Sequence, residues 1–349
     1  MKNKFFDIAL RLREEKSISE KEIEYLVNNI TKENLEYING LAFRRKQEVF
    51  GNVIYLRALA EISNICKNDC LYCGIRKSNK SVTRYKMSGD EIIKCCIAAY
   101  KTGFRTFVLQ GGENNFYSDE LLCEVIKRIK TDCSGCVVTL SLGERSRESC
   151  RKLFFAGADR YLLREETADK EHYKMLHPDN MSFENRIACL KALKEIGYQT
   201  GCGFMVGSPF QKAWHIAKDI KFIERFKPHM VGVGPFVPAA HTPFESFKGG
   251  SAELTCLVIS ILRLMNPHLL LPATTALATF GKNGRQRGIL SGANVVMPNV
   301  TPCVNRERYT LYNNKALSGS ESAEGLCMLY EELESIGQKP SFERGDYKE

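Results

Sequence analysis

The chain has 349 residues and carries 50 Lys and Arg against 41 Asp and Glu, a formal net charge of +9. Its 44% apolar and 26% charged residues are ordinary globular values, which exclude disorder, collagen-like repeats and a coiled coil as its main organisation. No run of about 18 uncharged apolar residues is present, so we expect no membrane span. The first residues alternate charged and apolar side chains, as an amphipathic helix does and a secretory signal does not, so we expect a cytoplasmic protein.

The predicted elements alternate between strands and helices after a helical segment at residues 1–48. Eight buried, β-rich runs follow it, at residues 55–62, 106–110, 136–142, 160–164, 202–207, 230–236, 269–275 and 294–298. Helical patterns separate these runs, for example at residues 89–103, 118–130, 183–197 and 252–265. This order predicts an α/β fold, a complete (βα)8 TIM barrel over residues 49–312, with a C-terminal helical extension over 313–349 packed on it. An open doubly wound sheet is the alternative, but it usually stops at five or six strands.

Polar residues follow these runs at their carboxyl ends, where TIM barrels place their active sites. They are Gln110, Gly111, Gly112 and Glu113 after the second run, Ser141 after the third, Arg164 and Glu166 after the fourth, Thr274 and Thr275 after the seventh, and Met297 in the eighth. Any one of the small polar residues could instead cap the next helix. Helix capping does not account for arginines and carboxylates gathered at one rim, so we expect the active site at this rim.

The 14 cysteines are unusual in a chain without signs of secretion, and in a reducing compartment some of them are expected to bind metal. Most fall in helical patterns, where a free cysteine packs as a small apolar residue: Cys95, Cys96, Cys123, Cys150, Cys189 and Cys256. Cys133 and Cys136 form a CxxC without a second half-site at a usable distance, which favours a helix-to-strand turn over a zinc or redox site.

Cys66, Cys70 and Cys73 form a CxxxCxxC motif directly after the first run. A structural zinc ion would need a fourth Cys or His, and none lies between Cys73 and Cys95. A 4Fe–4S cluster held by three cysteines leaves one iron open for another ligand, which suits a reactive centre. The motif therefore favours such a cluster over zinc.

With the aromatic Tyr72 before its last cysteine, this motif resembles the signature of the radical S-adenosylmethionine (SAM) enzymes. Further segments between residues 50 and 312 resemble, in order, the HydE family of FeFe-hydrogenase maturases, which is related to biotin synthase and methylornithine synthase. They include TFVLQGGE, TLSLGE, AGADRYLLREET, LPATTA and ANVVMPNVTP. The resemblance implies one 4Fe–4S cluster, SAM as cofactor and a 5′-deoxyadenosyl radical. It further implies that this radical attacks the sulfur of a cysteine-bound Fe(CO)2(CN) complex during assembly of the hydrogenase diiron cofactor.

The resemblance also implies residue roles. It assigns Cys66, Cys70 and Cys73 to the cluster, and SAM to Tyr72, Gln110, Gly111, Gly112, Glu113, Glu166 and Arg186. It assigns the substrate end of the cavity to Thr139, Ser141, Arg164, Thr274, Thr275, Met297 and Tyr309. An arginine there is suited to hold a substrate carboxylate, although Arg164 and Arg186 could also pair with neighbouring carboxylates. The implied partners are HydG, which supplies the complex, HydF, which receives the product, and a reductant such as ferredoxin or flavodoxin.

The chain departs from the HydE pattern at three places. The C-terminal segment offers only Cys327, so we predict no second cluster. Glu165 follows Arg164, and His177 stands where the family commonly has arginine. These differences leave a mutase of the methylornithine synthase type, acting on an amino acid, as an alternative. A non-catalytic iron–sulfur or zinc scaffold is the alternative from another class. The basic residues around Cys66 would suit phosphate groups, but no RNA-binding module accompanies them, so we expect no nucleic-acid partner.

Overall fold

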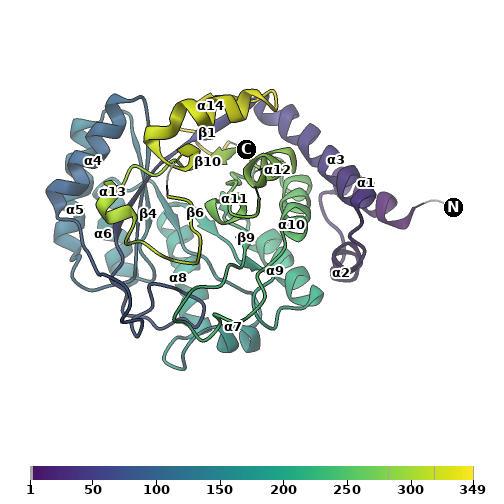
Figure 1. Cartoon of the computed structure of the whole chain (residues 1–349), viewed down its shortest axis with the longest axis horizontal. Coiled ribbons are helices and arrows are strands. Elements are labelled where there is room, and N and C mark those ends of the chain that lie inside the picture. The colour runs from purple at the N-terminus through teal and green to yellow at the C-terminus, as the bar shows by residue number, and fades with distance from the viewer. Residues whose placement is uncertain (1–2, 282, 318, 349) are drawn as a thin grey trace.

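The computed structural model describes residues 3–281, 283–317 and 319–348, and shows strands surrounded by helices (Figure 1). The strands are β1 (Val53–Leu56), β2 (Ala58–Ser63), β3 (Thr106–Gly111), β4 (Val137–Ser141), β5 (Arg160–Leu162), β6 (Gln199–Cys202), β7 (Met205–Val206), β8 (Met230–Val231), β9 (Gly234–Pro235), β10 (Val295–Val296) and β11 (Lys339–Ser341). The helices are α1 (Lys4–Glu15), α2 (Glu20–Asn28), α3 (Lys32–Phe50), α4 (Gly89–Lys101), α5 (Asp119–Asp132), α6 (Arg147–Phe155), α7 (Lys170–Leu176), α8 (Phe183–Ile196), α9 (Ala213–Phe226), α10 (Ala252–Met265), α11 (Thr275–Ala278), α12 (Gly284–Leu290), α13 (Cys303–Arg306) and α14 (Leu326–Glu334).

The strands close into a barrel, as the alternating pattern predicts. β2, β3, β4, β5, β6 and β8 form one parallel sheet in that order. Single parallel bridges complete the ring, from Met230 to Leu270, from Pro272 to Val295 and from Asn299 back to Leu59. The predicted TIM barrel of parallel strands is therefore confirmed, with α4, α5, α6, α8, α9 and α10 between successive strands.

The predicted seventh run forms only isolated bridges and no named strand. Pro272 lies within it and has no N–H to donate to a neighbouring strand, which limits the length of its ladder. The predicted first run is divided, because β1 pairs with β10 and β11 while β2 pairs with β3.

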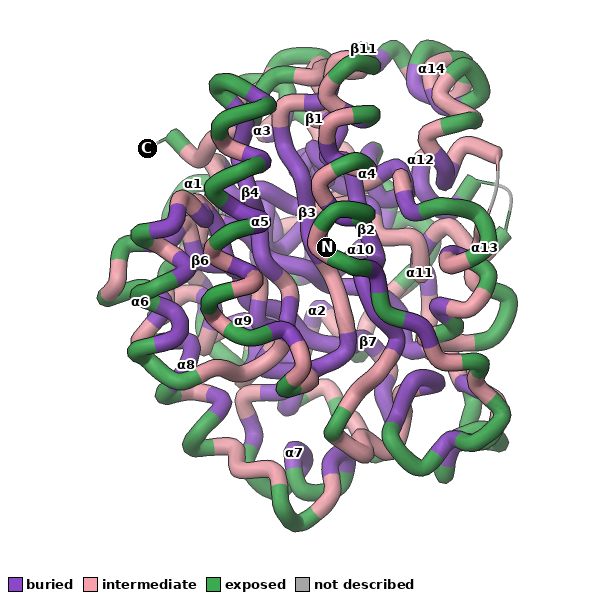
Figure 2. Tube along the Cα trace, turned by 90° about the vertical axis from the view of Figure 1, so that its left-hand side faces the viewer, coloured by how far each residue is buried: buried purple, intermediate pink, exposed green. Residues whose placement is uncertain are grey.

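The N-terminal helices cover the barrel on one side. Each starts at a side-chain cap, provided by Asn3, Ser19 and Thr31. α3 packs along α10, and α2 packs on α9. Because α10 lies between the barrel and α3, residues from Thr255 to Met265 are all buried, which explains why this helix is apolar on every face. The Cα trace coloured by burial shows the same layering, with mostly buried strands inside helices that expose one face (Figure 2).

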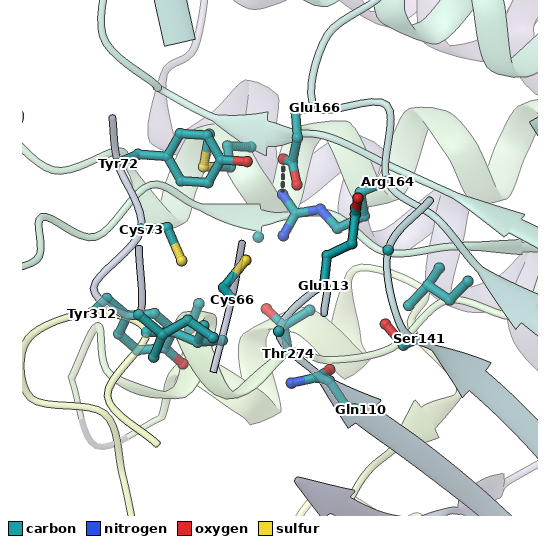
Figure 3. Close-up of a pocket in the computed structure, with 18 of the residues that line it drawn as sticks. Cys66, Tyr72, Cys73, Gln110, Glu113, Ser141, Arg164, Glu166, Thr274 and Tyr312 are labelled. Carbon is teal, nitrogen blue, oxygen red and sulfur yellow. Dashed lines mark ion pairs between the residues drawn. The ribbon is translucent and has the colours of Figure 1, made fainter. Parts of the chain in front are cut away.

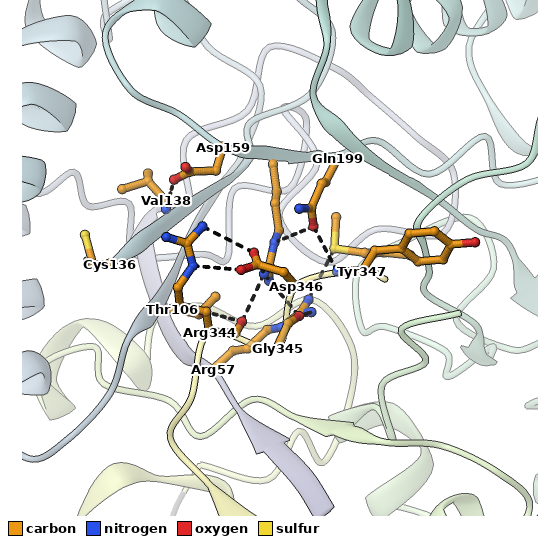
Figure 4. Close-up of polar contacts among 12 residues, drawn as sticks. Arg57, Thr106, Cys136, Val138, Asp159, Gln199, Arg344, Gly345, Asp346 and Tyr347 are labelled. Carbon is orange, nitrogen blue, oxygen red and sulfur yellow. Dashed lines mark hydrogen bonds and ion pairs between the residues drawn. The ribbon is translucent and has the colours of Figure 1, made fainter. Parts of the chain in front are cut away.

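The C-terminal extension contains the predicted helix, α14, and also a strand that the sequence pattern does not indicate. β11 adds to the barrel edge by pairing in parallel with β1. The residues after it cover the amino ends of the strands, where the fully buried Arg160 donates to the backbone oxygens of Arg344 and Gly345 and forms a 2.8 Å ion pair with Asp346 (Figure 4). Thr106 Oγ1 also donates to the Arg344 oxygen, at 2.9 Å.

The end of the barrel opposite to the predicted site is therefore covered by residues 344–346. Among the helices of the described residues, none has the length and apolar character needed to cross a membrane.

Candidate active site

A cavity of about 300 Å³ opens at the carboxyl ends of the strands, at the rim where the polar residues were predicted to converge (Figure 3). Of the predicted residues, thirteen line it: Cys66, Tyr72, Cys73, Gln110, Gly111, Gly112, Glu113, Ser141, Arg164, Glu166, Arg186, Thr274 and Tyr309. They come from the loop after β2, the ends of β3, β4 and β5, the first turn of α8, and the segments on either side of β10.

The three cysteines lie in one long loop after β2, residues 64–87, which we call the cluster loop. Arg84 organises this loop from within. Its Nη1 donates to the oxygens of Asn64 and Ile75, and its Nη2 donates to those of Arg76 and Asn79, all at 2.6–2.9 Å. One guanidinium thus satisfies four backbone carbonyls that no helix or sheet satisfies, and holds the two ends of the loop together.

The thiols of Cys66 and Cys73 face the cavity, while the Cys70 thiol lies against the sulfur of Met181 at 3.6 Å and does not line it. Burial raises the pKa of all three thiols, that of Cys73 to about 12, and neighbouring thiolate charges raise the pKa of Cys70 and Cys73 further. Three thiolates at this place therefore require a nearby positive charge, which a bound iron cluster supplies.

This donor set fits a cluster better than one metal ion. Within the described residues, no three His, Cys, Asp or Glu side chains converge as ligands of a single ion would. In a cubane cluster each thiolate would bind a different iron, so its cysteines need not meet at one point. Cys66, Cys70 and Cys73 are the residues that would hold it.

Gly112 lets the end of β3 approach the cluster loop. A Cβ atom at this position would lie 2.5 Å from the backbone oxygen of Ile65 and 2.9 Å from the Cβ of Cys66. The glycine is therefore needed for the close approach of two backbones. The neighbouring Gly111 leaves the backbone open to the cavity, and Gln110 Nε2 donates to the hydroxyl of Tyr309 at 3.4 Å across it.

A chain of charges runs along one wall of the cavity. Lys67 Nζ lies 3.0 Å from Glu113 Oε1, and Glu113 Oε2 accepts a 2.8 Å hydrogen bond from the backbone N–H of Glu144. The Glu144 carboxylate in turn lies 2.8 Å from Arg186 Nε. Gly143 makes room for this arrangement, since a Cβ there would lie 2.3 Å from Glu113 Oε2. The wall thus offers fixed charges of both signs, as a zwitterionic amino-acid moiety requires.

Arg164 and Glu166 form a second ion pair in the middle of the cavity, with Arg164 Nη2 2.9 Å from Glu166 Oε2 (Figure 3). Glu166 has a left-handed backbone, φ 66°, which is uncommon for a residue other than glycine. Its N–H donates to the oxygen of Gly203 at 3.0 Å, which holds it in that conformation. Backbone strain of this kind concentrates at functional sites, where it directs a side chain that a regular strand would turn elsewhere.

Tyr72 is held by a stack of rings. Its hydroxyl lies 3.3 Å from His177 Nε2, and the His177 ring stacks on Tyr173 with the centroids 3.9 Å apart. Burial lowers the pKa of His177 to about 3, so the ring is neutral. His177 Nδ1 lies 2.9 Å from the Tyr173 backbone oxygen, which accepts its proton, so Nε2 is the acceptor for the Tyr72 hydroxyl. His177 therefore acts here as a support of the cluster loop.

Three predicted substrate residues do not line the cavity, and neither does Cys70. Thr139 lies on β4 two residues before Ser141 and shares its face of the strand, one layer deeper, where its buried hydroxyl has no hydrogen-bond partner among the described residues. Thr275 Oγ1 donates to Glu321 of the C-terminal extension at 2.8 Å, because α11 begins at Thr275, after its N-cap Thr274, and turns this side chain away from the cavity. Met297 packs with Met230, Leu270 and Val295 in the barrel interior.

Sequence reasoning missed several residues of the cavity wall, among them Phe236, Val237, Leu311 and Tyr312. The first two directly follow β9, so the rule that sites lie at strand ends would have found them. Leu311 and Tyr312 lie in an irregular segment after β10 that carries no pattern. Glu144 follows the third run, but its pairing with Arg186 along the cavity wall depends on how α8 packs.

Comparison with known proteins agrees with this geometry. A family model described as the radical SAM superfamily matches residues 60–223. The chain is 41% identical to the [FeFe] hydrogenase maturase subunit HydE of Thermotoga maritima over 313 residues, 90% of this chain and 89% of that protein. It is 28% identical to 3-methylornithine synthase of Methanosarcina acetivorans over 93% of this chain and 91% of that one.

Among solved structures, methylornithine synthase (PylB) superposes with a TM-score of 0.81 at 26% identity, covering 96% of this chain and 97% of that one. The fold is therefore shared with PylB over almost the whole chain. The cysteine motif, the glycine-lined rim and the identity to HydE over nine-tenths of the chain lead to one assignment: the protein is a radical SAM enzyme and belongs to the HydE family of hydrogenase maturases.

Proposed function

We propose that this protein acts in FeFe-hydrogenase maturation on a cysteine-bound Fe(CO)2(CN) complex, in the way that the HydE family pattern implies. The observation that carries the proposal is the convergence of the Cys66 and Cys73 thiols, the Gly111–Gly112 backbone and the Arg164–Glu166 ion pair on one cavity. Cys66, Cys70 and Cys73 would hold the 4Fe–4S cluster, which with bound SAM would supply the 5′-deoxyadenosyl radical for attack on the sulfur of the complex. The chain's own residues bind, orient and enclose the reactants.

The charged wall is suited to the amino-acid moiety of SAM. The carboxylate of Glu113 would face its ammonium group, and Arg186 its carboxylate, while Glu144 and Lys67 keep both side chains in place. Gly111 and Gly112 line the cavity, so the backbone at the end of β3 would face the ligand, and Gly112 keeps this backbone close to the cluster loop.

The substrate would lie on the side of Ser141, Thr274 and Tyr309. Arg164 can offer its planar guanidinium to the carboxylate of a substrate cysteine, with Glu166 holding it in orientation. The buried Thr139 hydroxyl, which lacks a partner in the described structure, marks a deeper polar position below Ser141. Apolar side chains such as Leu162, Met205 and Phe236 line the remaining wall and limit the entry of water, which protects a radical from side reactions.

The proposal further includes HydG as the source of the complex and HydF as the acceptor of the product. It also includes a cytoplasmic location. A mutase of the methylornithine synthase type is the second candidate, because the fold is shared over almost the whole chain with PylB and because Arg164 would equally suit an amino-acid carboxylate.

One experiment separates the two candidates. The reconstituted protein is incubated anaerobically with SAM, a reductant and the synthetic cysteine–iron complex, and the products are analysed by mass spectrometry. A 5′-deoxyadenosyl group attached to the substrate sulfur supports the maturase. Formation of 5′-deoxyadenosine together with a rearranged amino acid, in a parallel reaction with lysine, supports the mutase. Zinc in place of iron, without SAM cleavage, would contradict both.

A further inference from the structure

The cluster loop carries a concentration of positive charge, most of which the inner cavity does not use: Lys67 pairs with Glu113 of the cavity wall and Arg84 binds the loop's own carbonyls, whereas the other four basic side chains do neither. Residues 64–87 contain six basic side chains and one acidic side chain, Asp69, so these 24 residues hold +5 of the chain's net charge of +9. Asp69 is neutralised by Arg76, whose Nε lies 2.7 Å from its carboxylate. Lys77, Lys80 and Lys86 are exposed.

A second cavity, of about 560 Å³, lies under these charges. It is lined by Lys67, Lys77, Lys80 and Arg84 and by no carboxylate among the described residues. Lys86 stands beside it, with its Nζ 5.2 Å from the centroid of the Phe116 ring that forms part of its wall. We call Lys77, Lys80 and Lys86, with the rim of this cavity, the basic face.

Cys66 is common to both cavities. This residue lines the inner cavity, where its thiol faces Arg164 and Glu113, and it also lines the outer cavity together with Lys67 and Arg84. A cluster held by Cys66 would therefore be separated from the basic face only by the thickness of the cluster loop. In the proposed function SAM and substrate occupy the inner cavity, so they do not use the outer one.

We propose that the basic face is the docking site of an acidic one-electron carrier protein that reduces the cluster through Cys66. This inference rests on the proposed function, which requires a reduced cluster. In the step, one electron leaves the reduced carrier and arrives at the cluster, so the carrier is oxidised and the cluster reduced by one electron each, and no proton or group is transferred.

The charge arrangement suits a transient partner. Complementary charge raises the rate of encounter and orients two proteins, while it adds little to lasting affinity, as a carrier that must leave again requires. The basic face is also firmly supported, because Arg84 ties four backbone carbonyls of the loop together beneath it. The lysines thus lie on a fixed surface.

The test uses the cluster-loaded enzyme and flavodoxin in its hydroquinone form. The variant combines Lys77→Glu and Lys80→Glu, two exposed side chains outside the inner cavity. The matched control combines Lys21→Glu on α2 and Lys127→Glu on α5, two exposed lysines on helices away from the cluster loop. Three quantities are measured: the dissociation constant for flavodoxin, the rate of cluster reduction by flavodoxin, and SAM cleavage driven by the methyl viologen radical cation.

We expect the variant to bind flavodoxin on the order of tenfold more weakly at 50 mM salt and to reduce its cluster correspondingly more slowly. At about 500 mM salt the variant and the wild type should converge, because exposed charges are then screened over a few ångströms. SAM cleavage with methyl viologen should remain at the wild-type level, since this small cation has no need of the basic face.

If the variant and the wild type bind flavodoxin equally at low salt, the proposed docking site is wrong. It is also wrong if the control with Lys21→Glu and Lys127→Glu loses as much flavodoxin affinity as the variant does. A wild type that binds flavodoxin at this face but cleaves no SAM with methyl viologen would instead contradict the proposed function, and leave the docking result standing. Flavodoxin binding is measured independently of turnover, so the two failures are distinguishable.

Discussion

Replacing Glu165 with glutamine should stabilise the protein at alkaline pH and leave its stability nearly unchanged at acidic pH. Glu165 is completely buried behind the cavity, where its Oε2 accepts a 2.6 Å hydrogen bond from the N–H of Gly203 and its Oε1 has no partner among the described residues. Burial raises the pKa of Glu165 to about 8 from an ordinary 4.5, and the Glu166 charge adds to the rise while Arg164 opposes it.

The direction in which stability changes with pH follows from how tightly each state binds the proton of Glu165. The folded state holds the proton of Glu165 more tightly than the unfolded state does, so its contribution to stability is complete below pH 4.5 and is lost as the pH rises through about 8. Each unit of pKa difference corresponds to about 1.4 kcal/mol, so the loss reaches at most about 5 kcal/mol above pH 8. Glutamine stays neutral and still accepts from Gly203, so it avoids this loss.

The assay is urea unfolding of both proteins between pH 5.5 and 9, followed by circular dichroism under anaerobic conditions. The free energy of unfolding of Glu165→Gln, relative to wild type, should rise by about 2–3 kcal/mol between pH 5.5 and pH 9, because wild type has already lost about 1.4 kcal/mol at pH 5.5. The exposed substitution Glu124→Gln on α5 serves as a control and should show no such trend. A constant difference between Glu165→Gln and wild type across this range would refute the reasoning.

Three further results are expected. Cys73→Ser should lose most of the iron of anaerobically reconstituted protein, whereas Cys327→Ser should retain about four irons per chain; iron lost from both would indicate a second cluster. Gly112→Ala should displace Ile65 and weaken SAM binding at least tenfold in equilibrium dialysis, and unchanged affinity would contradict the close approach. Asp346→Asn should lower the free energy of unfolding by about 1–3 kcal/mol, because Arg160 loses its counter-charge inside the barrel. An unchanged free energy of unfolding would show that the backbone oxygens of Arg344 and Gly345 are enough to stabilise the buried guanidinium.

The site could be predicted from the sequence chiefly because all strands of a parallel barrel run in the same direction. Parallel strands end at one rim, so Glu113, Ser141 and Arg164 could be brought together from the order of the runs alone. Individual side chains at the ends of runs were less predictable. The order of the runs predicts Met297 at the cavity, but it packs against Met230, Leu270 and Val295, because the sequence of a run does not reveal how deep in the barrel a side chain lies.

Contacts between distant and irregular segments could not be predicted. β11 consists of Lys339, Pro340 and Ser341, which carry no β pattern, and it becomes a strand only because β1 presents an edge to it. The left-handed backbone of Glu166 likewise depends on its bond to Gly203, in the loop after β6. In both cases the local sequence leaves the conformation open and the tertiary partner selects it.

The position of β1 between β10 and β11 has a consequence for biosynthesis. The cluster loop leaves the ribosome soon after β2, but the two strands that enclose β1 are more than 200 residues further along the chain. Long-range pairing of this kind forms late in folding. The cysteine loop is thus synthesised well before the barrel can close, and the nascent chain passes through a stage in which three thiols are already present and the wall of the future cavity is still open.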